Sequence, residues 1–454
     1  MSFHVRGAAV ALTLAALVAA GCGSPGSDSG DSAEQSDEQA TRTVEPPDVA
    51  AAGDVTLTVW DQEVRGGQAK QIKQLNQAFQ EKYPNVTIDR VARSFEDLNK
   101  TLKLAVSGPD APDVVQANQG RPVMGTLVKG GLLEPLDPYA EAYGWSDRYS
   151  QLLLDLNSFS SDGNEFGSGN LYGLSQMGEI VGVFYNKTKV AEPPTTLAEF
   201  EQSLDEAKQE DDIPIQFGNL DAWPGIHEYE TVLGRTASKE QVRDFVFARE
   251  GASFDTPEFT AAAEQIRGWA DDGYFTPDFN GTGYDPAWQQ FAKGKGRYLI
   301  AGTWLTADLT EQMGEDVGFM LLPGTEADAE PVALGGESLP FAVTSKSENP
   351  DVAAAYIDFL TNGEAATVLA ETGNLPAMPV DEGAIPEGLP SEVFAEWTRL
   401  NEADGLIPYL DYTTPTFFDD ISGAIQELLG GESDPAQFTA GVEESFREFA
   451  DEQK

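Results

Sequence analysis

Side chains that carry covalent chemistry are scarce in this chain of 454 residues. Its single cysteine is Cys22 and its two histidines are His4 and His227, so only His227 could be the base of a Ser-His-Asp triad in the body of the chain. The nucleophile elbow GxSxG is absent, because Gly173-Leu-Ser175-Gln-Met177 lacks the closing glycine. Gly294-Lys295-Gly296 lacks both the Ser or Thr and the upstream glycine of a P-loop. The absence of these motifs argues against a triad hydrolase and against nucleotide hydrolysis.

Cys22 follows a segment that is typical of a signal peptide. A short basic start precedes residues 7–20, which are apolar or small, and Gly21 stands directly before the cysteine. The apolar stretch is shorter than the roughly 18 to 20 residues of a bilayer-spanning helix. We expect residues 1–21 to be removed and Cys22 to be acylated, as in a bacterial lipobox, which would anchor the exported protein on the outer side of the cell membrane. Ordinary secretory cleavage that leaves Cys22 as a free thiol is the alternative.

Acidic side chains dominate the charge of the chain. The sequence has 76 Asp and Glu against 28 Lys and Arg, which gives a formal net charge of -48 and argues against nucleic acid as a partner. Asp162-Gly-Asn164-Glu165, and Asp271-Asp272 with Asp278 and Asn280, could ligate calcium through oxygen atoms. Neither group has the EF-hand spacing, so we interpret both as solvated loops and predict no metal site. No spacing singles out a carboxylate pair for glycoside hydrolysis.

The composition divides the chain into a tether and a body. Residues 22–53 are rich in Gly, Ser, Asp, Glu, Gln and Pro and contain no aromatic residue, so we expect a disordered linker after the lipidated cysteine. The body runs from Asp54 to Lys454, which is longer than one hydrophobic core usually supports. We therefore expect two lobes.

Strand and helix patterns alternate along the body. We predict strands at 55–60, 86–91 and 113–117, with a helix that opens at Gly66-Gly67 and buries Ile72, Leu75 and Phe79. This βαβ order implies a parallel sheet covered by helices. Further helices are predicted at 95–107, 195–209, 256–272, 351–361 and 434–451.

Five separated segments follow the order and spacing of one protein family. They are 55–60 with the helix and the Tyr83-Pro84-Asn85-Val86 turn that follow it; Ser107-Gly-Pro-Asp-Ala-Pro112-Asp113-Val114-Val115; residues 171–200, with Leu171-Tyr172-Gly173-Leu174 and Phe184-Tyr185-Asn186-Lys187; residues 291–304; and Asn349-Pro350 with the helix to Leu360. Through them the body resembles the family 1 extracellular solute-binding proteins, the maltose-binding-like group that delivers carbohydrate to ABC importers.

The resemblance implies a fold and a function. It implies an α/β, two-lobed periplasmic-binding-protein-like fold (type II), with a hinge between the lobes and the ligand in the interlobe cleft. One lobe would comprise residues 54–178 and 325–374, and the other 179–324 and 375–454. The protein would bind a sugar, with an oligosaccharide as the expected ligand, without chemistry or cofactor of its own. It would act as a monomer and deliver the sugar to the transmembrane subunits of an ABC permease.

The resemblance also implies which residues contact the ligand. Relatives place aromatic or acidic ligand contacts at positions that match Trp304, Trp60, Trp223, Phe418 and Glu179 of this sequence. A neutral sugar would stack its apolar faces on the rings and donate its hydroxyls to the carboxylate. Further candidates from nearby loops are Gln119, Arg121, Gly336, Glu337 and Asp411, with Tyr409 and Tyr412 ranked after them.

Three alternatives remain open at this point. Each tryptophan could instead be a core residue, as is common in long chains. The ligand could be a polyamine, a peptide or a metal, since the negative charge would attract cations. A secreted glycoside-processing enzyme that uses Glu179 as an acid is a further possibility from another class.

Overall fold

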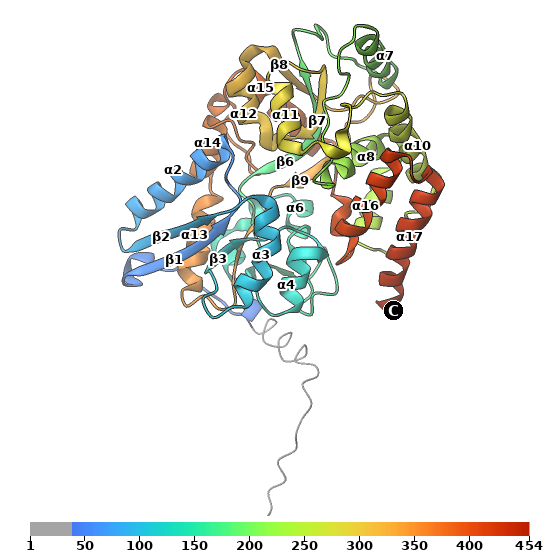
Figure 1. The fold of residues 1–454 in the computed structure, drawn as a ribbon. Helices are drawn as coiled ribbons and strands as arrows, with labels where there is room; N and C mark the ends of the chain where they lie inside the picture. The colour runs from blue at the N-terminus through green and yellow to red at the C-terminus, as the bar shows by residue number, and fades with distance from the viewer. Residues whose placement is uncertain (1–38, 454) are drawn as a thin grey trace, which may run out of the picture.

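A computed structural model describes residues 39–453, and within them two β-sheets form the centres of two lobes (Figure 1). The first sheet has the strand order β10-β3-β1-β2. Strands β1 (Val55–Asp61), β2 (Val86–Ala92) and β3 (Val114–Gln116) run parallel, and β10 (Phe341–Val343) pairs antiparallel with β3. The predicted βαβ arrangement with a parallel sheet is confirmed for this lobe.

Alternation and helical periodicity explain why these segments form this layer. Val55, Leu57 and Val59 of β1 are buried, whereas the intervening threonines are not, as expected for a strand covered on one face. On the following helix, α2 (Gly66–Lys82), Ile72 and Phe79 lie on the buried face. Further elements of this lobe are α3 (Phe95–Ser107), α4 (Thr126–Lys129), α5 (Asp137–Tyr143), α6 (Gln151–Asp155), the pair β4 (Ser158–Phe159) and β5 (Asn170–Leu171), α13 (Pro350–Leu360) and α14 (Gly363–Glu371).

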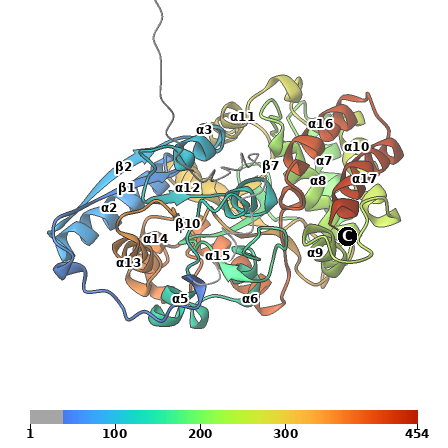
Figure 2. The same ribbon diagram turned by 90° about the horizontal axis from the view of Figure 1, so that it is seen from below.

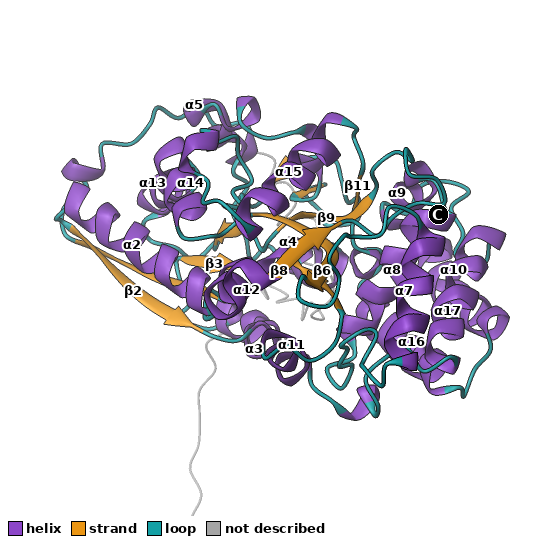
Figure 3. Cartoon of the chain, turned by 90° about the horizontal axis from the view of Figure 1, so that it is seen from above, coloured by secondary structure: helices purple, strands orange, loops and turns teal. Residues whose placement is uncertain are grey.

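The second sheet is organised around one long strand. β6 (Gly178–Asn186) is almost entirely buried and pairs antiparallel with β7 (Tyr298–Gly302), β8 (Val317–Met320) and β9 (Ala333–Glu337), and β11 (Leu406–Ile407) lies parallel to β9. Helices flank the strands in the view of Figure 3. They are α7 (Leu197–Gln209), α8 (Trp223–Thr236), α9 (Lys239–Val246), α10 (Pro257–Asp271), α11 (Tyr284–Ala292), α12 (Thr306–Met313), α15 (Leu389–Glu402), α16 (Phe417–Gly430) and α17 (Pro435–Glu452).

Three chain segments cross between the lobes side by side. The start of β6 pairs with β9 from Gly178–Glu337 to Ile180–Gly335, and the amide of Gly178 donates to the carbonyl of Leu375 at 2.9 Å. After β9 the chain enters β10 of the first sheet within four residues. These segments form the connection at which the lobes could hinge. The lobe ranges given above stay a prediction, and β9, which they assign to the first lobe, pairs within the second sheet.

The predicted helices and strands appear in the structure close to their predicted bounds. The strands predicted at 55–60, 86–91 and 113–117 and the helix predicted at 95–107 appear as β1, β2, β3 and α3 with bounds that agree to within a residue or so. The predicted helices further along correspond to α7, α10, α13 and α17. Helices α16 and α17 pack together beside α8 and α10, at the opposite side of the molecule from α2 (Figures 1 and 2).

The ordered body begins earlier than the predicted boundary at Asp54. Residues 49–51 form a short 3-10 helix, and Val49 is 2% exposed. Asn85 holds this segment by donating from Nδ2 to the carbonyls of Val49 and Gly53, at 2.8 Å each. The apolar Val49 therefore docks on the first lobe, so the end of the predicted linker is structured.

The predicted signal peptide, the lipidated Cys22 and the linker as far as residue 38 lie outside the described residues. Within residues 39–453, no helix combines the length and the apolar character needed to cross a membrane.

A buried ion pair fixes the carboxyl end of the first sheet. Asp61, the fully buried last residue of β1, receives hydrogen bonds from Nε and Nη2 of Arg90 on β2, both at 2.5 Å. Arg90 Nη2 also donates to the carbonyl of Glu63 at 2.7 Å, and the amide of Glu63 donates to Asp61 Oδ1 at 2.9 Å. The pair therefore sets the path of the chain as it leaves β1.

We predict that Asp61→Ala lowers the free energy of unfolding by about 3 kcal/mol, because it leaves the guanidinium of Arg90 without its counter-ion in a mostly buried site. Urea unfolding followed by circular dichroism would measure the loss. Asp89→Ala is the matched control, since Asp89 is an exposed aspartate next to Arg90 on β2. Equal stability of the two variants would contradict a structural role for the pair.

Candidate functional site

A cleft lies between the two lobes, and it encloses about 690 Å³ outside the protein atoms, open solvent at its mouth included. Both lobes and the crossing segments line it. The lining residues are Gln62, Arg65, Gln68, Phe95, Glu96 and Asn118 from the first lobe; Glu179 and Leu339 from the crossing segments; and Trp223, Ile226, His227, Trp304, Tyr409, Asp411, Tyr412 and Phe418 from the second lobe.

The first lobe contributes chain ends that the parallel sheet brings together. Gln62 and Arg65 follow β1, and Phe95 and Glu96 begin α3 directly after β2. Because the carboxyl ends of parallel strands meet at one edge of a sheet, these residues from separate loops face the same cleft. The amide of Gln62 donates to Gln116 Oε1 at 2.8 Å, so the end of β3 also fixes this loop.

A wall of rings forms the second lobe's side of the cleft. Trp223 and His227 stand one turn apart on α8, so they share a face of the helix, with ring centroids 5.2 Å apart. The His227 ring lies 5.7 Å from Trp304 and 5.3 Å from Tyr409. Tyr412 continues the row at 5.4 Å from Tyr409. The wall is thus continuous from Trp304 to Tyr412.

The position of Trp304 depends on a glycine and a tyrosine. A Cβ on Gly302, the last residue of β7, would lie 1.8 Å from Cζ3 of Trp304 and within 2.2 Å of two further ring atoms. The indole therefore folds back over a residue that must lack a side chain. The indole Nε1 donates to the hydroxyl of Tyr284 at 2.6 Å, which fixes the orientation of the ring.

Arg65 bridges the two lobes at this cleft. Its Nη2 lies 3.3 Å from Oδ1 of Asp285 on α11, and its guanidinium lies 6.0 Å from the centroid of the Tyr284 ring. Since Tyr284 also holds Trp304, the cationic side chain of the first lobe contacts the same group that orients the indole. The lobes therefore touch across the cleft in this structure.

Several carboxyls around the cleft are neutral or partly neutral near pH 7. Burial raises the pKa of Glu179 and Asp411 to about 7 each, although the Tyr409 hydroxyl donates to Glu179 Oε1 at 2.7 Å and opposes part of the shift. Burial likewise raises the pKa of Glu63 to about 7 and that of Glu337 to about 8. Charge repulsion from Glu63 and Asp411 also raises the pKa of Glu179, and that from Glu179 raises the pKa of Glu337, so the cleft resists carrying full negative charge.

His227 is neutral in this setting. Burial lowers its pKa to about 3, and its Nδ1 has no hydrogen-bond partner within the described chain. A neutral imidazole among aromatic rings extends the wall, and within residues 39–453 no carboxylate is hydrogen-bonded to it to orient it as a base.

Comparison with known proteins assigns the family. A family model described as bacterial extracellular solute-binding protein matches residues 74–385, which is more than half of the chain. The chain belongs to the bacterial extracellular solute-binding protein family. The predicted family resemblance is therefore confirmed, and the proteins of this family bind solutes.

Two relatives by sequence are named as sugar-binding proteins. The multiple sugar-binding protein of Streptococcus mutans is 21% identical over 304 residues, which span 65% of this chain and 68% of that protein. The maltotriose-binding protein of Pyrococcus abyssi is 25% identical over 339 residues, which span 72% of this chain and 68% of that protein.

Solved structures share the fold. A chitin oligosaccharide binding protein matches with a TM-score of 0.74 at 20% identity, over 88% of this chain and 99% of the other. The GacH receptor of Streptomyces glaucescens matches with a TM-score of 0.70 at 18% identity, over 88% of this chain and 100% of the other. The predicted α/β, two-lobed type II fold is confirmed.

The structure brings half of the predicted ligand contacts together in the cleft. Trp304, Trp223, Glu179, Asp411 and Phe418 all line it. They come from β6, α8, α16 and the short 3-10 helices that follow β7 and precede α16, which lie far apart in the sequence. Their role in binding a ligand stays a prediction.

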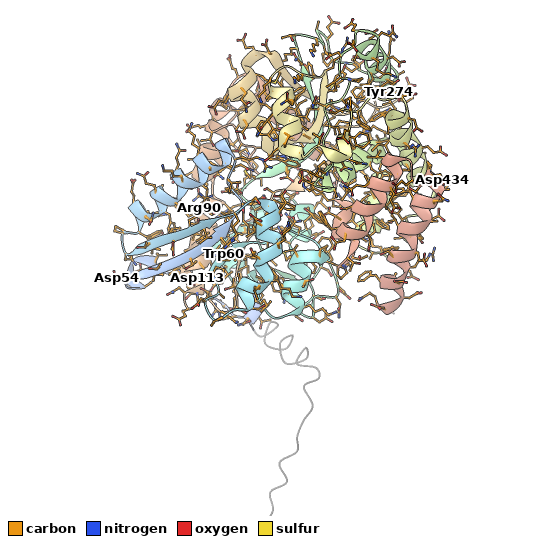
Figure 4. The ribbon with its side chains drawn as sticks, in the orientation of Figure 1. Asp54, Trp60, Arg90, Asp113, Tyr274 and Asp434 are labelled. Carbon is orange, nitrogen blue, oxygen red and sulfur yellow. The ribbon has the colours of Figure 1, made fainter. Side chains whose placement is uncertain are left out.

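Trp60 lies outside the lining of the cleft. Its ring is half-buried and packs against Arg93, whose guanidinium is 4.2 Å from the ring centroid. Figure 4 shows Trp60 and Arg90 in the first lobe. Gln62, two residues further along the chain, lines the cleft in its place.

Four other predicted contacts are buried beside the cleft rather than in its lining. Gln119 donates from Nε2 to the carbonyls of Glu337 and Ser338, at 3.2 and 2.9 Å. Gly336 pairs with Glu179 in the sheet, and the Glu337 side chain accepts a hydrogen bond from Asn157 Nδ2. These groups hold the crossing segments in position.

Arg121 donates its hydrogen bonds to backbone carbonyls of the second lobe. Its Nη1 donates to Thr413 at 2.7 Å and to Val246 at 3.3 Å, and its Nη2 donates to Phe247 at 3.3 Å. Its side chain therefore joins the lobes and leaves the cleft lining to Asn118.

Sequence reasoning did not single out several lining residues. The sequence analysis treats His227 only as a possible base and predicts no helix over α8, where the spacing of four residues from Trp223 places both rings on one wall. Arg65, Gln62, Phe95 and Glu96 follow the ends of predicted parallel strands, which is a signal that the strand predictions already contained.

Because of these buried carboxyls, we predict that the free energy of unfolding falls as the pH rises. In the folded state, burial raises the pKa values of Glu63, Glu179 and Asp411 to about 7 and that of Glu337 to about 8, so the folded protein binds more protons than the unfolded chain between about pH 4.5 and 8. The free energy of unfolding therefore decreases across that window. We predict a higher melting temperature at about pH 5.5 than at about pH 8, measured by calorimetry at constant ionic strength.

Glu337→Gln separates this effect from the general charge of the chain. The amide cannot ionise, so the variant should show a shallower fall of the melting temperature between the two pH values. Glu348→Gln is the control, because this substitution also removes one negative charge but lies at an exposed residue. Parallel curves for Glu337→Gln and the wild type would contradict burial of an ionisable Glu337.

Proposed function

We propose that this protein is the sugar-binding component of an ABC importer, which captures an oligosaccharide in the interlobe cleft and delivers it to a membrane permease. The observation that carries the proposal is the wall of rings formed by Trp223, Trp304, His227, Tyr409 and Tyr412. Such a wall offers flat apolar faces over a length that exceeds one ring. Aromatic packing of this kind contributes roughly 0.5 to 1.5 kcal/mol beyond area burial.

Polar groups in the lining suit the hydroxyls of a neutral sugar. Glu179 and Asp411 offer carboxyl oxygens, while Gln62 and Asn118 offer amides that can donate and accept. Arg65 is the one basic side chain among the described lining residues, and Asp285 already neutralises it. A sugar that carries carboxylate or phosphate groups would meet repulsion in this cleft, so we infer a neutral sugar.

The names of the relatives support a carbohydrate ligand, since both sequence relatives are named for sugars. The family is extracellular, which implies export of this protein. We propose that Cys22 anchors it by a lipid on the outer side of the cell membrane. Closure of the lobes over the sugar would bury the ligand and create the form that the permease recognises.

A cationic ligand such as a polyamine is the second candidate. Glu96, Glu179 and Asp411 lie in the lining together with aromatic rings, and such a site could hold an extended ammonium compound. The raised pKa values of Glu179 and Asp411 disfavour this reading, because both carboxyls are only partly ionised near pH 7 when no cation is bound.

A thermal-shift screen tests the proposal. The folded protein would be heated with neutral mono- and oligosaccharides, with spermidine, with calcium and with short peptides. A ligand at 100 times its dissociation constant stabilises the folded state by roughly 2.7 kcal/mol, so a bound sugar raises the melting temperature. A shift by spermidine, calcium or peptide alone would overturn the sugar assignment. Cleavage of the bound sugar, read by chromatography, would favour the glycoside-processing enzyme.

Trp304 and Gly302 give a paired prediction for the sugar found in that screen. Trp304→Ala should weaken binding by at least about tenfold, or about 1.4 kcal/mol, because it removes a stacking face. Gly302→Ala should weaken binding to a similar extent, because the new Cβ would displace the indole, while the backbone φ of -84° suits alanine. Isothermal titration calorimetry would measure both.

The double variant shows whether Gly302 acts through Trp304. If it does, Gly302→Ala adds little loss in a Trp304→Ala background. Gly268→Ala on α10 is the matched control, since a Cβ there meets no atom within 4 Å. Full affinity in Trp304→Ala would remove the indole from the ligand site.

A further inference from the structure

The wall of rings does not stop at the cleft. Beyond Tyr412 it meets Phe166 of the first lobe at a centroid distance of 6.4 Å, with the rings at 82°. Phe166 in turn lies 5.0 Å from Phe159 and 5.0 Å from Phe247 of the second lobe. The row of aromatic side chains therefore continues past the end of the cleft.

Phe166 and Phe247 line a second groove between the lobes. It encloses about 2530 Å³, open solvent included, and its lining residues differ entirely from those of the cleft. Besides rings, the groove presents the hydroxyls of Ser160, Ser168 and Ser253, and charged groups that include Asp162, Glu165, Arg249 and Arg447. Rings can pack on the faces of a sugar, and hydroxyls and carboxyls can hydrogen-bond to its hydroxyls.

Tyr412 lies at the contact between the cleft and the groove. It lines the cleft, and its ring contacts Phe166, which lines the groove. The side chain is 4% exposed and its hydroxyl donates to Gln119 Oε1 at 3.2 Å. Next to it, the Thr413 carbonyl accepts from Arg121 Nη1 at 2.7 Å.

Gly120 allows the backbone of the first lobe to approach Tyr412 of the second lobe closely. Its φ of +76° favours glycine, and a Cβ there would lie 2.5 Å from both Cα and Cβ of Tyr412. The backbone of the first lobe thus packs directly against Tyr412. Tyr412 is held by Gly120, Gln119 and Phe166 on the first lobe.

We propose that Tyr412 is the end wall of the ligand cleft and determines the length of the oligosaccharide that the protein accepts. This inference rests on the proposed function. The sugar chain would end against the Tyr412 ring, so units beyond that end would gain no contact in the wild-type protein. The second groove would then be the space that a longer chain enters once the ring is removed.

The test uses the neutral oligosaccharide series, malto-, chito- or xylo-, whose members raise the melting temperature of the full-length protein. Calorimetric dissociation constants would be measured for every length from the monosaccharide to the hexasaccharide. In the wild type, we expect affinity to increase with length and then to stay level. In Tyr412→Ala, we expect the affinity of the longest member relative to the shortest to increase at least fivefold over the wild-type ratio.

A double variant shows whether the extra units enter the groove. Phe166→Ala alone should leave the wild-type length preference unchanged, because the end wall still stands. In the Tyr412→Ala background it should cancel the gain for long chains, since Phe166 is the first ring beyond the partition. Tyr412→Phe keeps the ring and loses only the bond to Gln119, so it should keep the wild-type preference.

Each outcome separates the inference from the function on which it rests. Unchanged length preference in a folded Tyr412→Ala variant would overturn the end wall and leave sugar capture intact. If Tyr412→Ala does not fold, Tyr412→Leu gives the same comparison with less lost volume. A wild-type protein whose melting temperature rises with no neutral sugar of the thermal-shift screen would overturn sugar capture, and the end wall with it.

Discussion

The ion pair between Asp61 and Arg90 is the constraint on which the ligand side of the first lobe depends. It joins two parallel strands at their carboxyl ends and, through the carbonyl of Glu63, sets the direction of the loop that follows β1. That loop carries Gln62 and Arg65 into the cleft. Arg65 then reaches Asp285 on the other lobe, so an interaction inside one sheet determines where the lobes meet. The energetic reason is that a guanidinium and a carboxylate removed from water must remain together.

The cleft combines many acidic groups with little net charge. Burial keeps Glu179, Asp411 and Glu337 partly protonated near pH 7, and the neutral His227 adds a ring without adding a cation. A protein with a formal charge of -48 therefore presents to its ligand a surface of rings, amides and weakly charged carboxyls. The overall charge governs solubility and long-range repulsion, whereas local burial governs recognition.

The sequence predicted local elements well and the contacts between distant ones less well. Strands and helices such as β1 and α3 follow from alternation and periodicity, which are local properties. Trp304 and Glu179 line the cleft, and the resemblance to the family had implied both. Trp60 and Arg121 are residue types that could contact a sugar, and both lie near strand ends. In the structure, however, Trp60 packs against Arg93, and Arg121 donates to backbone carbonyls of the second lobe. These contacts depend on tertiary packing, which a local sequence pattern does not reveal. The ring wall likewise depends on how α8, β7 and the segment before α16 assemble.

The contact between Trp223 and Trp304 gives the cleft an optical property. Two of the seven tryptophans in the sequence line it, with ring centroids 6.1 Å apart, and the neutral imidazole of His227 touches both. A solute that displaces water from these indoles changes the polarity around them and therefore their emission. The native protein can thus act as its own fluorescent sensor of occupancy, without an attached dye.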